Sequence, residues 1–288
     1  MSRLGPVSVG GSNPVRIMGI INASPESFYK KSVYGEARGL ARAAKAMEED
    51  GADIIDIGGM STAPYLRTLV PEAKETERVT GAILAVQKVS RLPISVDTCR
   101  SGVARAALKL GAEIINDVTG LKFDANMPEV LREYRPSVVV CAYSREPASG
   151  NHVAEARSML RQSISIARKS GIPNDRITVD PAIGFFRKKA DGIFFTRIKS
   201  DWLRRDVAIM KNLRALKIGH PLLVSVSRKS FIGKILDEDD PDKRLAGSLA
   251  AETIAVLNGA DIIRTHNVGT TCDVVKIVQE LQSPKKGL

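Results

Sequence analysis

The chain has 288 residues, of which 43% are hydrophobic and 26% are charged, and its formal net charge is +11. This composition excludes a disordered chain, which lacks the apolar residues for a core, and a membrane protein, because no stretch approaches the ~20 apolar residues that span a bilayer. The positive charge is explained by binding of nucleic acid, by binding of a small anionic substrate or by a solvated basic surface. Composition does not distinguish these three explanations, so the pattern along the chain must do so.

Short apolar runs alternate with longer amphipathic segments along the whole chain. The eight predicted strands are residues 15–21, 53–57, 94–96, 113–115, 137–140, 177–179, 222–226 and 262–264. The predicted helices include residues 35–49, 71–89, 100–110, 153–169, 242–257 and 268–282. Runs of Ile and Val without polar alternation are typical of parallel strands buried on both faces. Eight such units predict a single-domain α/β fold, the TIM (β/α)8 barrel, with a doubly wound open sheet as the alternative.

A repeated pattern supports the barrel. Gly51, Gly111 and Gly259 are each followed by Ala, an acidic residue and an Ile-Ile pair. We expect each glycine just past a helix end, where φ is positive, with a buried strand after it. The barrel is expected to span residues 15–282, between an N-terminal extension of residues 1–14 and a C-terminal tail of residues 283–288.

The cysteines and the N-terminus indicate the cellular compartment of the protein. Cys99, Cys141 and Cys272 are far apart and form no CxxC pair, so neither a disulfide framework nor a structural zinc site is expected. Residues 1–14 contain no apolar segment of the kind found in a secretory signal. We therefore expect a cytoplasmic protein.

Charged or amide residues end or directly follow most of the predicted strands. They are Asn22, Asp56, Asp97, Asn116, Asp180, Lys229, Arg264 and His266. In a parallel barrel the carboxyl ends of the strands share one mouth, where the loops build the site. A helix cap explains any single Asp, but caps do not require Lys, Arg and His at the same end.

The acidic and amide members of this set suit a flat nitrogen heterocycle. Asp97 and Asp180 accept paired N–H donors, and Asn116 supplies both a donor and an acceptor. No nucleophile–base pair and no phosphate-binding glycine motif stands out in the sequence. The pattern therefore favours positioning and electrostatic stabilisation over covalent catalysis.

The basic members suit an anion. Lys229, Arg264 and His266 are expected opposite the acidic group, where they suit a phosphate or diphosphate. Asn22 is expected either to orient that anion or to bind Mg2+, which prefers oxygen ligands together with substrate phosphates.

Several segments resemble the signatures of the dihydropteroate synthases, in the order of that family. They are residues 18–28 (MGIINASPESF), 53–64 (DIIDIGGMSTAP), 95–98, 115–118, 180–185, 225–233 and 264–268. The resemblance implies a TIM barrel that condenses hydroxymethyl-dihydropterin diphosphate with an aminobenzoate and releases diphosphate. It also implies a dissociative pathway, in which diphosphate leaves first and a pterin-methyl cation forms.

The resemblance assigns roles to matched positions. The implied pterin contacts are Asp97, Asn116, Asp180 and Lys229. The implied diphosphate contacts are Asn22, Arg264 and His266, with Mg2+ near Asn22. Thr62 falls in a loop that closes over the site, and Ser230 near the aromatic amine. The implied catalytic residues are Asp97, Lys229, Arg264 and His266, and the implied assembly is a homodimer.

The sequence departs from the family in the loops over the second substrate. Ala63 stands where the family has Arg, Met60 replaces a Glu, and Asn267 replaces an Asp. The pterin positions match, whereas the identity of the aromatic amine stays open.

Residues 185–206 form an unusual segment that is rich in Arg, Lys and aromatic residues. We interpret it as an extended loop and helix of the barrel with a basic face. Single-stranded nucleic acid, or a phosphate on a larger second substrate, are the alternatives.

Two other functions are compatible with the pterin positions. One is a pterin-dependent methyltransferase, and the other is a non-catalytic pterin- or nucleic-acid-binding barrel. A methyltransferase needs neither the loop 227–233 nor the pair Arg264 and His266, since no diphosphate leaves, so the synthase is favoured. We expect small-molecule substrates as partners, and neither nucleic acid nor a membrane.

Overall fold

The structure is a computed structural model, which describes residues 1–24, 37–60, 69–189 and 192–282. Thr62, Ala63 and the predicted tail of residues 283–288 lie outside the described residues.

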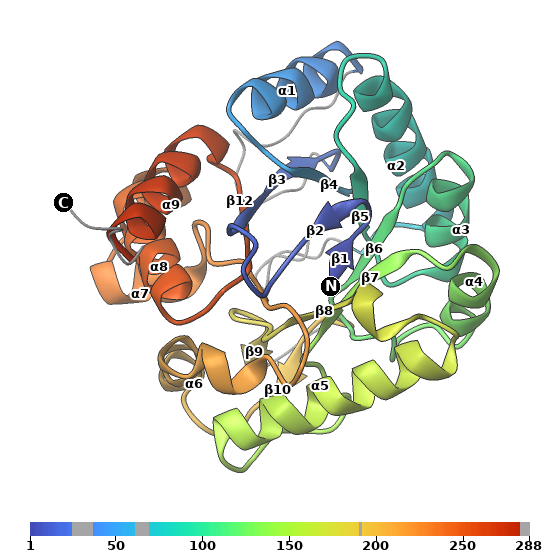
Figure 1. The fold of residues 1–288 in the computed structure, drawn as a ribbon. Coiled ribbons are helices and arrows are strands. Elements are labelled where there is room, and N and C mark those ends of the chain that lie inside the picture. Colours follow the sequence, from blue (N-terminus) through green and yellow to red (C-terminus); the bar gives the residue numbers. More distant parts are fainter. Residues whose placement is uncertain (25–36, 61–68, 190–191, 283–288) are drawn as a thin grey trace.

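Eight parallel strands form one sheet in the order β11-β12-β3-β4-β5-β6-β7-β8. A parallel bridge between Val179 and Leu222 joins β8 to β11 and closes the ring. The strands are β3 (Arg16–Asn22), β4 (Ile54–Gly58), β5 (Ile94–Asp97), β6 (Ile114–Asp117), β7 (Ser137–Cys141), β8 (Ile177–Asp180), β11 (Leu223–Val224) and β12 (Ile262–Thr265). Helices surround this ring (Figure 1). The predicted TIM barrel is confirmed, and the ring closure excludes the open sheet.

The described helices are α1 (Ala37–Glu49), α2 (Glu72–Gln87), α3 (Ser101–Lys109), α4 (Met127–Tyr134), α5 (His152–Lys169), α6 (Trp202–Lys211), α7 (Ser230–Leu236), α8 (Leu245–Leu257) and α9 (Val268–Gln282). Short 3-10 turns are η2 (Asn174–Arg176), η3 (Leu213–Leu216) and η4 (Pro241–Lys243). The helix predicted from residue 242 starts later, because Pro241 begins the separate turn η4. Among these described helices, none is both long and apolar enough to cross a bilayer.

Alternation along the strands separates two layers inside the barrel. The first inward side chains are apolar: Met18, Ile54, Ile114 and Ile262 form a small buried cluster. In β4, β6 and β12 the next residue on the same face, two positions further on, is polar, because side chains alternate with a period of two. In β4 this is Asp56. The intervening side chains point outward and pack against the helices. The strands are therefore apolar at one end of the barrel and polar at the other.

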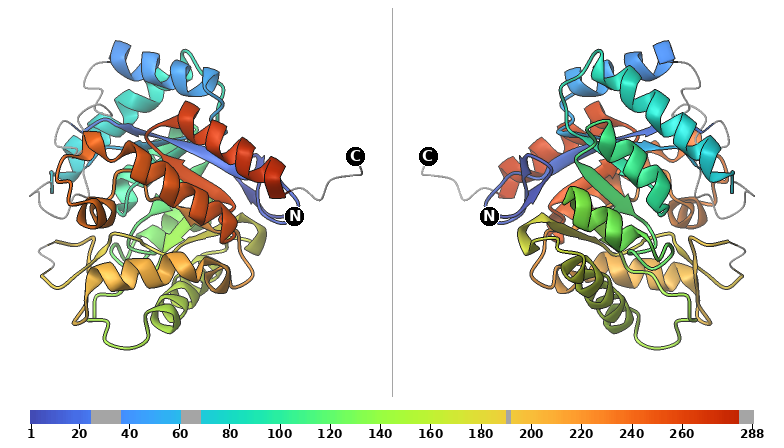
Figure 2. Two further views of the ribbon diagram at one scale, coloured as in Figure 1. Left: turned by 90° about the vertical axis from the view of Figure 1, so that its left-hand side faces the viewer. Right: turned by 90° about the vertical axis from the view of Figure 1, so that its right-hand side faces the viewer.

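The N-terminal residues close the apolar end of the barrel. A hairpin of β1 (Arg3–Leu4) and β2 (Val7–Ser8) lies across the ring in Figure 1, and at the end of the barrel in the side views of Figure 2. Leu4 and Val9 are buried there, in the same cluster as Met18 and Ile114. The segment predicted as an extension thus packs as a plug under the barrel.

The repeated glycines adopt the conformation that their positions require. Gly51, Gly111 and Gly259 have φ values of 95°, 91° and 98°. Only glycine enters this region without steric cost, so each one turns the chain from a helix into the following strand. The prediction drawn from the repeat is confirmed.

The plug predicts a stability effect far from the mouth. Leu4→Ala removes buried apolar volume and should lower the free energy of unfolding by ~2–5 kcal/mol. Urea unfolding followed by circular dichroism measures this change. Leu69→Ala is the matched control, because Leu69 is 61% exposed and should change stability by less than ~0.5 kcal/mol. Equal losses for both variants would contradict a packed hairpin.

Candidate active site at the barrel mouth

Arg264 lies at the centre of the polar end. Its Nε donates to Asp56 Oδ2 at 2.6 Å, and its Nη2 donates to Asp97 Oδ2 at 2.9 Å. The three side chains come from β12, β4 and β5, so these ion pairs cross the inside of the mouth. Two carboxylates around one guanidinium leave a net negative charge. This end of the site can therefore stabilise a cation or accept N–H donors.

Asn116 and Asp180 also line this end of the site. Asn116, at the end of β6, donates from Nδ2 to Asp56 Oδ2 at 3.2 Å. The other oxygen of Asp56 is buried, and none of the described residues forms a hydrogen bond with it, which is unusual for a carboxylate and suits a ligand N–H. Asp180 ends β8, where its Oδ1 accepts the N–H of Ala182 at 2.6 Å.

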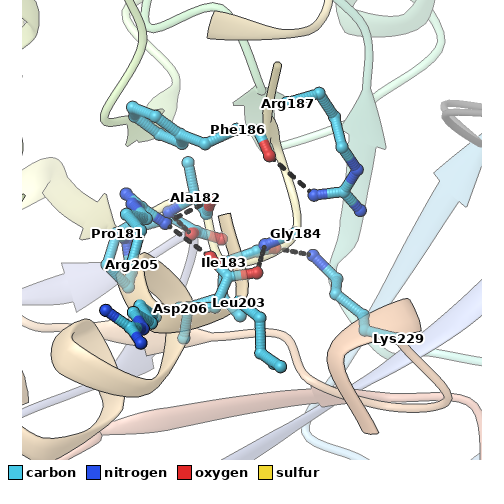
Figure 3. Close-up of polar contacts among 12 residues, drawn as sticks. Pro181, Ala182, Ile183, Gly184, Phe186, Arg187, Leu203, Arg205, Asp206 and Lys229 are labelled. Carbon is cyan, nitrogen blue, oxygen red and sulfur yellow. Dashed lines mark hydrogen bonds and ion pairs between the residues drawn. The ribbon is translucent and has the colours of Figure 1, made fainter. Parts of the chain in front are cut away.

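Lys229 extends along the loop that follows β8 (Figure 3). Its Nζ donates to Ile183 O at 2.5 Å and lies 4.4 Å from the ring centroid of Phe185. Gly184 makes this close approach possible: its φ is +85°, and a Cβ there would lie 2.9 Å from Lys229 Cδ. The ammonium group is thus placed at the mouth by the backbone of residues 183–185.

A buried ion pair supports that loop from behind. Arg205 and Asp206, on α6, are both buried and pair at 3.0 Å. Arg205 donates to Pro181 O and Ala182 O at 2.7 and 3.0 Å, and Asp206 accepts the N–H of Gly184 at 3.0 Å. In Figure 3, Arg205 lies on one side of the loop, and Lys229 lies on the other. The pair therefore holds the backbone on which Lys229 rests.

His266 follows β12 and faces the loop after β11. Its Nδ1 lies 3.0 Å from Ser227 Oγ, which also accepts the backbone N–H of His266 at 3.3 Å. Next to Ser227, Arg228 donates from Nε and Nη2 to Asn267 Oδ1 at 3.1 and 2.9 Å. These contacts join the loops after β11 and β12 into one wall of the site.

Burial changes the protonation of the central groups. Burial raises the pKa of Asp97 to about 7, although Arg264 favours the carboxylate. Burial raises the pKa of Asp180 as well. Burial lowers the pKa of Lys229 to about 8, and burial together with Arg264 lowers the pKa of His266 to about 3. At neutral pH the imidazole is therefore neutral and acts through hydrogen bonds.

Comparisons with known proteins agree with this geometry. The family described as pterin binding enzyme matches residues 18–266. The dihydropteroate synthase of Synechocystis is 35% identical over 92% of this chain and 89% of its own, and that of Bacillus subtilis is 34% identical over 96% and 92%. The chain belongs to the pterin-binding enzyme family.

Solved structures of that family superpose on the barrel. The dihydropteroate synthase of Coxiella burnetii, in complex with pteroic acid, has a TM-score of 0.80 at 34% identity, with 94% of each chain covered. The Xanthomonas albilineans enzyme, in complex with 7,8-dihydropteroate, has a TM-score of 0.80 at 31% identity, with 95% of each chain covered. The chain is thus a transferase of the dihydropteroate synthase type.

The structure gathers most of the predicted site residues at this pterin-family mouth. The described ones are Asn22, Asp97, Asn116, Asp180, Lys229, Ser230, Arg264 and His266. One relation differs from the prediction: Arg264 contacts Asp97 directly and does not stand opposite it. Both side chains point into the barrel and meet inside its mouth, so their opposite charges pair.

Sequence reasoning left three contributors out of its site. The sequence pattern places Asp56 at the end of its strand, whereas only the fold shows that it contacts Arg264 and Asn116. Ser227 contacts His266 across two loops. Arg187, on β9 (Phe186–Arg187), reaches the Ser230 hydroxyl. An inward-facing Asp beside a predicted strand end was the available signal for Asp56.

The basic segment of residues 185–206 has a structural role. β9 pairs in parallel with β10 (Thr196–Arg197), and α6 follows. Phe186, Phe194 and Phe195 are buried, and Arg205 is only 1% exposed. A surface that stacks nucleic-acid bases needs exposed aromatic rings, so this packing favours the extended loop and helix predicted for the segment.

The raised pKa of Asp97 predicts a pH effect on stability. Between about pH 4, where an exposed Asp titrates, and the folded pKa of about 7, the folded chain keeps a proton that the unfolded chain releases. The contribution of Asp97 to the free energy of unfolding therefore falls as pH rises through this range. Urea unfolding at about pH 5 and about pH 7.5 should show a smaller fall for Asp97→Asn than for the wild type. Asp239→Asn, at an exposed carboxylate, should match the wild type. Identical slopes in all three proteins would contradict the assignment.

Proposed function

We propose that this mouth joins a hydroxymethyl-dihydropterin diphosphate to an aminobenzoate-type amine. The observation that carries the proposal is the inward cluster of Asp56, Asp97, Asn116 and Asp180 beside Lys229, in a barrel similar to dihydropteroate synthases. The carboxylates and the amide suit the ring N–H groups of a pterin. The buried oxygen of Asp56 that no described residue hydrogen-bonds is one acceptor already desolvated for such a ring.

The proposed reaction is dissociative. The bond between the pterin methylene carbon and the diphosphate oxygen breaks, and its electron pair leaves with the diphosphate. The methylene cation that remains is delocalised into the pterin ring, where Asp56 and Asp97 supply negative charge at the mouth. The lone pair of the aromatic amine then forms the new C–N bond, and the amine nitrogen releases a proton. No protein nucleophile is needed.

The diphosphate is proposed to lie toward the loops after β11 and β12. Lys229 supplies a positive charge there, and neutral His266 supplies a hydrogen bond. Asn22 ends β3 at the same mouth. Among the residues that the structure describes, no group of three His, Cys, Asp or Glu side chains could hold a metal. Mg2+ prefers oxygen ligands together with substrate phosphates, so the Asn22 amide oxygen would hold the ion at this mouth beside the diphosphate. Such an ion would neutralise charge on the departing diphosphate.

A cytosolic location is part of the proposal. Cys99, Cys141 and Cys272 are free and buried, which suits a reducing compartment. A homodimer is proposed from the surface. Helices α7, α8 and α9 lie side by side (Figure 1). Their exposed large apolar side chains are Ile235, Leu236, Ile254, Leu257, Ile277 and Leu281. Clustered apolar residues of this size mark a surface that a partner covers, and a second copy is the partner we propose.

Release of diphosphate tests the reaction. The purified protein is incubated with the pterin diphosphate, 4-aminobenzoate and Mg2+, and diphosphate is measured. Asp97→Ala and Lys229→Ala should each lower turnover by at least about a hundredfold, because charge stabilisation at the reacting centre is lost. Lys211→Ala, at an exposed position of α6, should retain wild-type turnover. Circular dichroism checks that the variants fold. Release that continues unchanged in Asp97→Ala would overturn the pterin assignment.

The dimer has its own test. Light scattering should give twice the chain mass for the wild type, and Ile277→Glu should shift the protein toward the monomer, because a charge is then buried in the interface. Ile277 is 63% exposed in the single chain, so folding of the monomer should tolerate the change. Leu84→Glu, on α2, is the control and should stay dimeric. A wild type that is monomeric at micromolar concentration would exclude this assembly.

A further inference from the structure

Most of the excess positive charge of this chain lies in one part of the barrel. Residues 152–220 contain 15 Lys and Arg but only 6 Asp and Glu, whereas the net charge of the whole chain is +11. This part includes helices α5 and α6, which pack against each other (Figure 1). The contacts described for the mouth involve none of the basic residues of α5, so those residues have a separate role.

Three arginines of α5 line a cavity. Arg157, Arg161 and Arg168 are spaced by four and seven residues, which places them on one face of the helix. The cavity has a volume of about 440 Å3, and Ile164, Ile218 and His220 also line it. A volume of this size accommodates a small-molecule ligand. We call this cavity the α5 groove.

The α5 groove lies toward the end of the barrel that the N-terminal hairpin covers. Helix α5 follows β7, which ends at the mouth, so Arg168 in its last turn lies at the opposite end. His220 precedes β11, and it lines a second cavity together with Gly10 and Ser12, beside the hairpin. A ligand in the groove therefore leaves the mouth free.

Arg157 shows that the groove lacks an acceptor. Its Nε is buried, and none of the described residues forms a hydrogen bond with it. Buried donors in folded proteins are almost always paired, so an isolated one requires an explanation. The side chain lines the groove, and an anion bound there would supply the acceptor.

The carboxylates closest in sequence to these arginines are engaged elsewhere. Glu155 Oε1 accepts the backbone N–H groups of Ser149 and Gly150 at 2.7 and 2.8 Å. Asp175 lies 3.7 Å from the guanidinium of Arg3 in the hairpin.

Arg168 is held by a neutral partner. Its Nε donates to the amide oxygen of Asn174, which orients the guanidinium without cancelling its charge. The groove therefore carries a positive charge that is available to a ligand.

The wall opposite α5 is a strained and fixed turn. Ile218 has a φ of 40°, which is an outlier for a β-branched residue, and Gly219 follows with a φ of 86°. The turn is held by His220, whose N–H donates to Lys217 O at 2.8 Å and whose Nδ1 lies 3.2 Å from Ile177 O. Strained backbone of this kind concentrates at ligand-binding sites.

The lining favours a chain of phosphate groups over nucleic acid. Guanidinium groups match phosphate oxygens in pairs, and the three arginines extend over about 16 Å of helix. Proteins that bind single-stranded nucleic acid without sequence preference also stack its bases on exposed aromatic rings. The ring of His220 is only 5% exposed, and the other uncharged side chains named are aliphatic. The groove thus provides charge and apolar surface but no stacking platform.

We propose that the α5 groove binds a small molecule that carries a chain of phosphate groups, either inorganic or attached to a nucleoside. Arg157, Arg161 and Arg168 bind the phosphates, and Ile164 and Ile218 contact the rest of the ligand. This site is separate from the mouth, and the inference does not depend on the proposed function.

Calorimetric titration with tripolyphosphate tests the site, at about 50 mM salt so that charges are weakly screened. The double variant Arg157→Gln/Arg161→Gln should bind at least about tenfold more weakly than the wild type, because charge-assisted hydrogen bonds are lost. Arg161→Gln alone, at an exposed position, should also weaken binding. Circular dichroism checks that the variants fold.

Two controls separate the groove from other positive sites. Arg38→Gln/Arg42→Gln removes two exposed arginines of α1 that are also four residues apart, and it should keep the wild-type affinity in the groove. Lys229→Ala removes a cation from the mouth, and this protein should still bind tripolyphosphate in the groove. Equal weakening by both double variants would show general attraction of anions and overturn the inference.

The choice of ligand distinguishes the remaining outcomes. Equal affinities for tripolyphosphate and ATP would identify the phosphate chain as the ligand, and tighter binding of ATP would identify a nucleotide. Binding that disappears in Lys229→Ala, or that persists unchanged in Arg157→Gln/Arg161→Gln, would place the anion elsewhere and contradict the proposal. A single-stranded oligonucleotide that binds the groove more tightly than both probes would replace it with a nucleic-acid surface. Absence of binding to the wild type would also exclude the site.

Discussion

Every second side chain of a parallel strand faces the inside of a closed barrel, and the site depends on this constraint. In β4 the inward positions are Ile54 and then Asp56, and in β12 they are Ile262 and then Arg264. The apolar pair belongs to the layer that the N-terminal hairpin covers. The charged pair belongs to the mouth, where the two residues form an ion pair. A register shift of one residue would turn these charges into the layer of helices.

Pairing makes the buried charges of the mouth tolerable. An isolated ion in such surroundings would lose its charge, whereas Arg264 between Asp56 and Asp97 compensates both. Two acids and one base still leave an excess of negative charge, which agrees with the raised pKa of Asp97. The same excess suits the cation that the proposed reaction forms. The same excess of negative charge therefore raises the pKa of Asp97 and would stabilise the cation.

The loop after β8 links the unusual segment of this chain to the chemistry. Arg205 and Asp206 hold its backbone from the α6 side, and Lys229 lies against its other side. Two residues beyond Phe185, Arg187 reaches Ser230. The net charge of +11 is therefore only partly a surface property. Within the segment, Arg205 holds the backbone of the loop, and Arg187 reaches the mouth.

Patterns formed by residues that are close in sequence predict much of this structure. The Ile-Val runs, the repeated Gly-Ala-acidic units and the polar residues at the strand ends predict the barrel and most of its mouth. They do so because strand burial and helix ends leave short-range signals. The helices α4 and α7 escaped prediction, since they have only 8 and 7 residues.

What the sequence by itself determined is the order of strands and the chemical type of each strand end. Only the tertiary structure decided which of these groups touch. Arg264 and Asp56 are 208 positions apart, and Arg187 and Ser230 are 43 apart. No local pattern encodes such pairs. They arise because ring closure brings β12 next to β3, one strand away from β4, and because α6 places Trp202 under the guanidinium of Arg187.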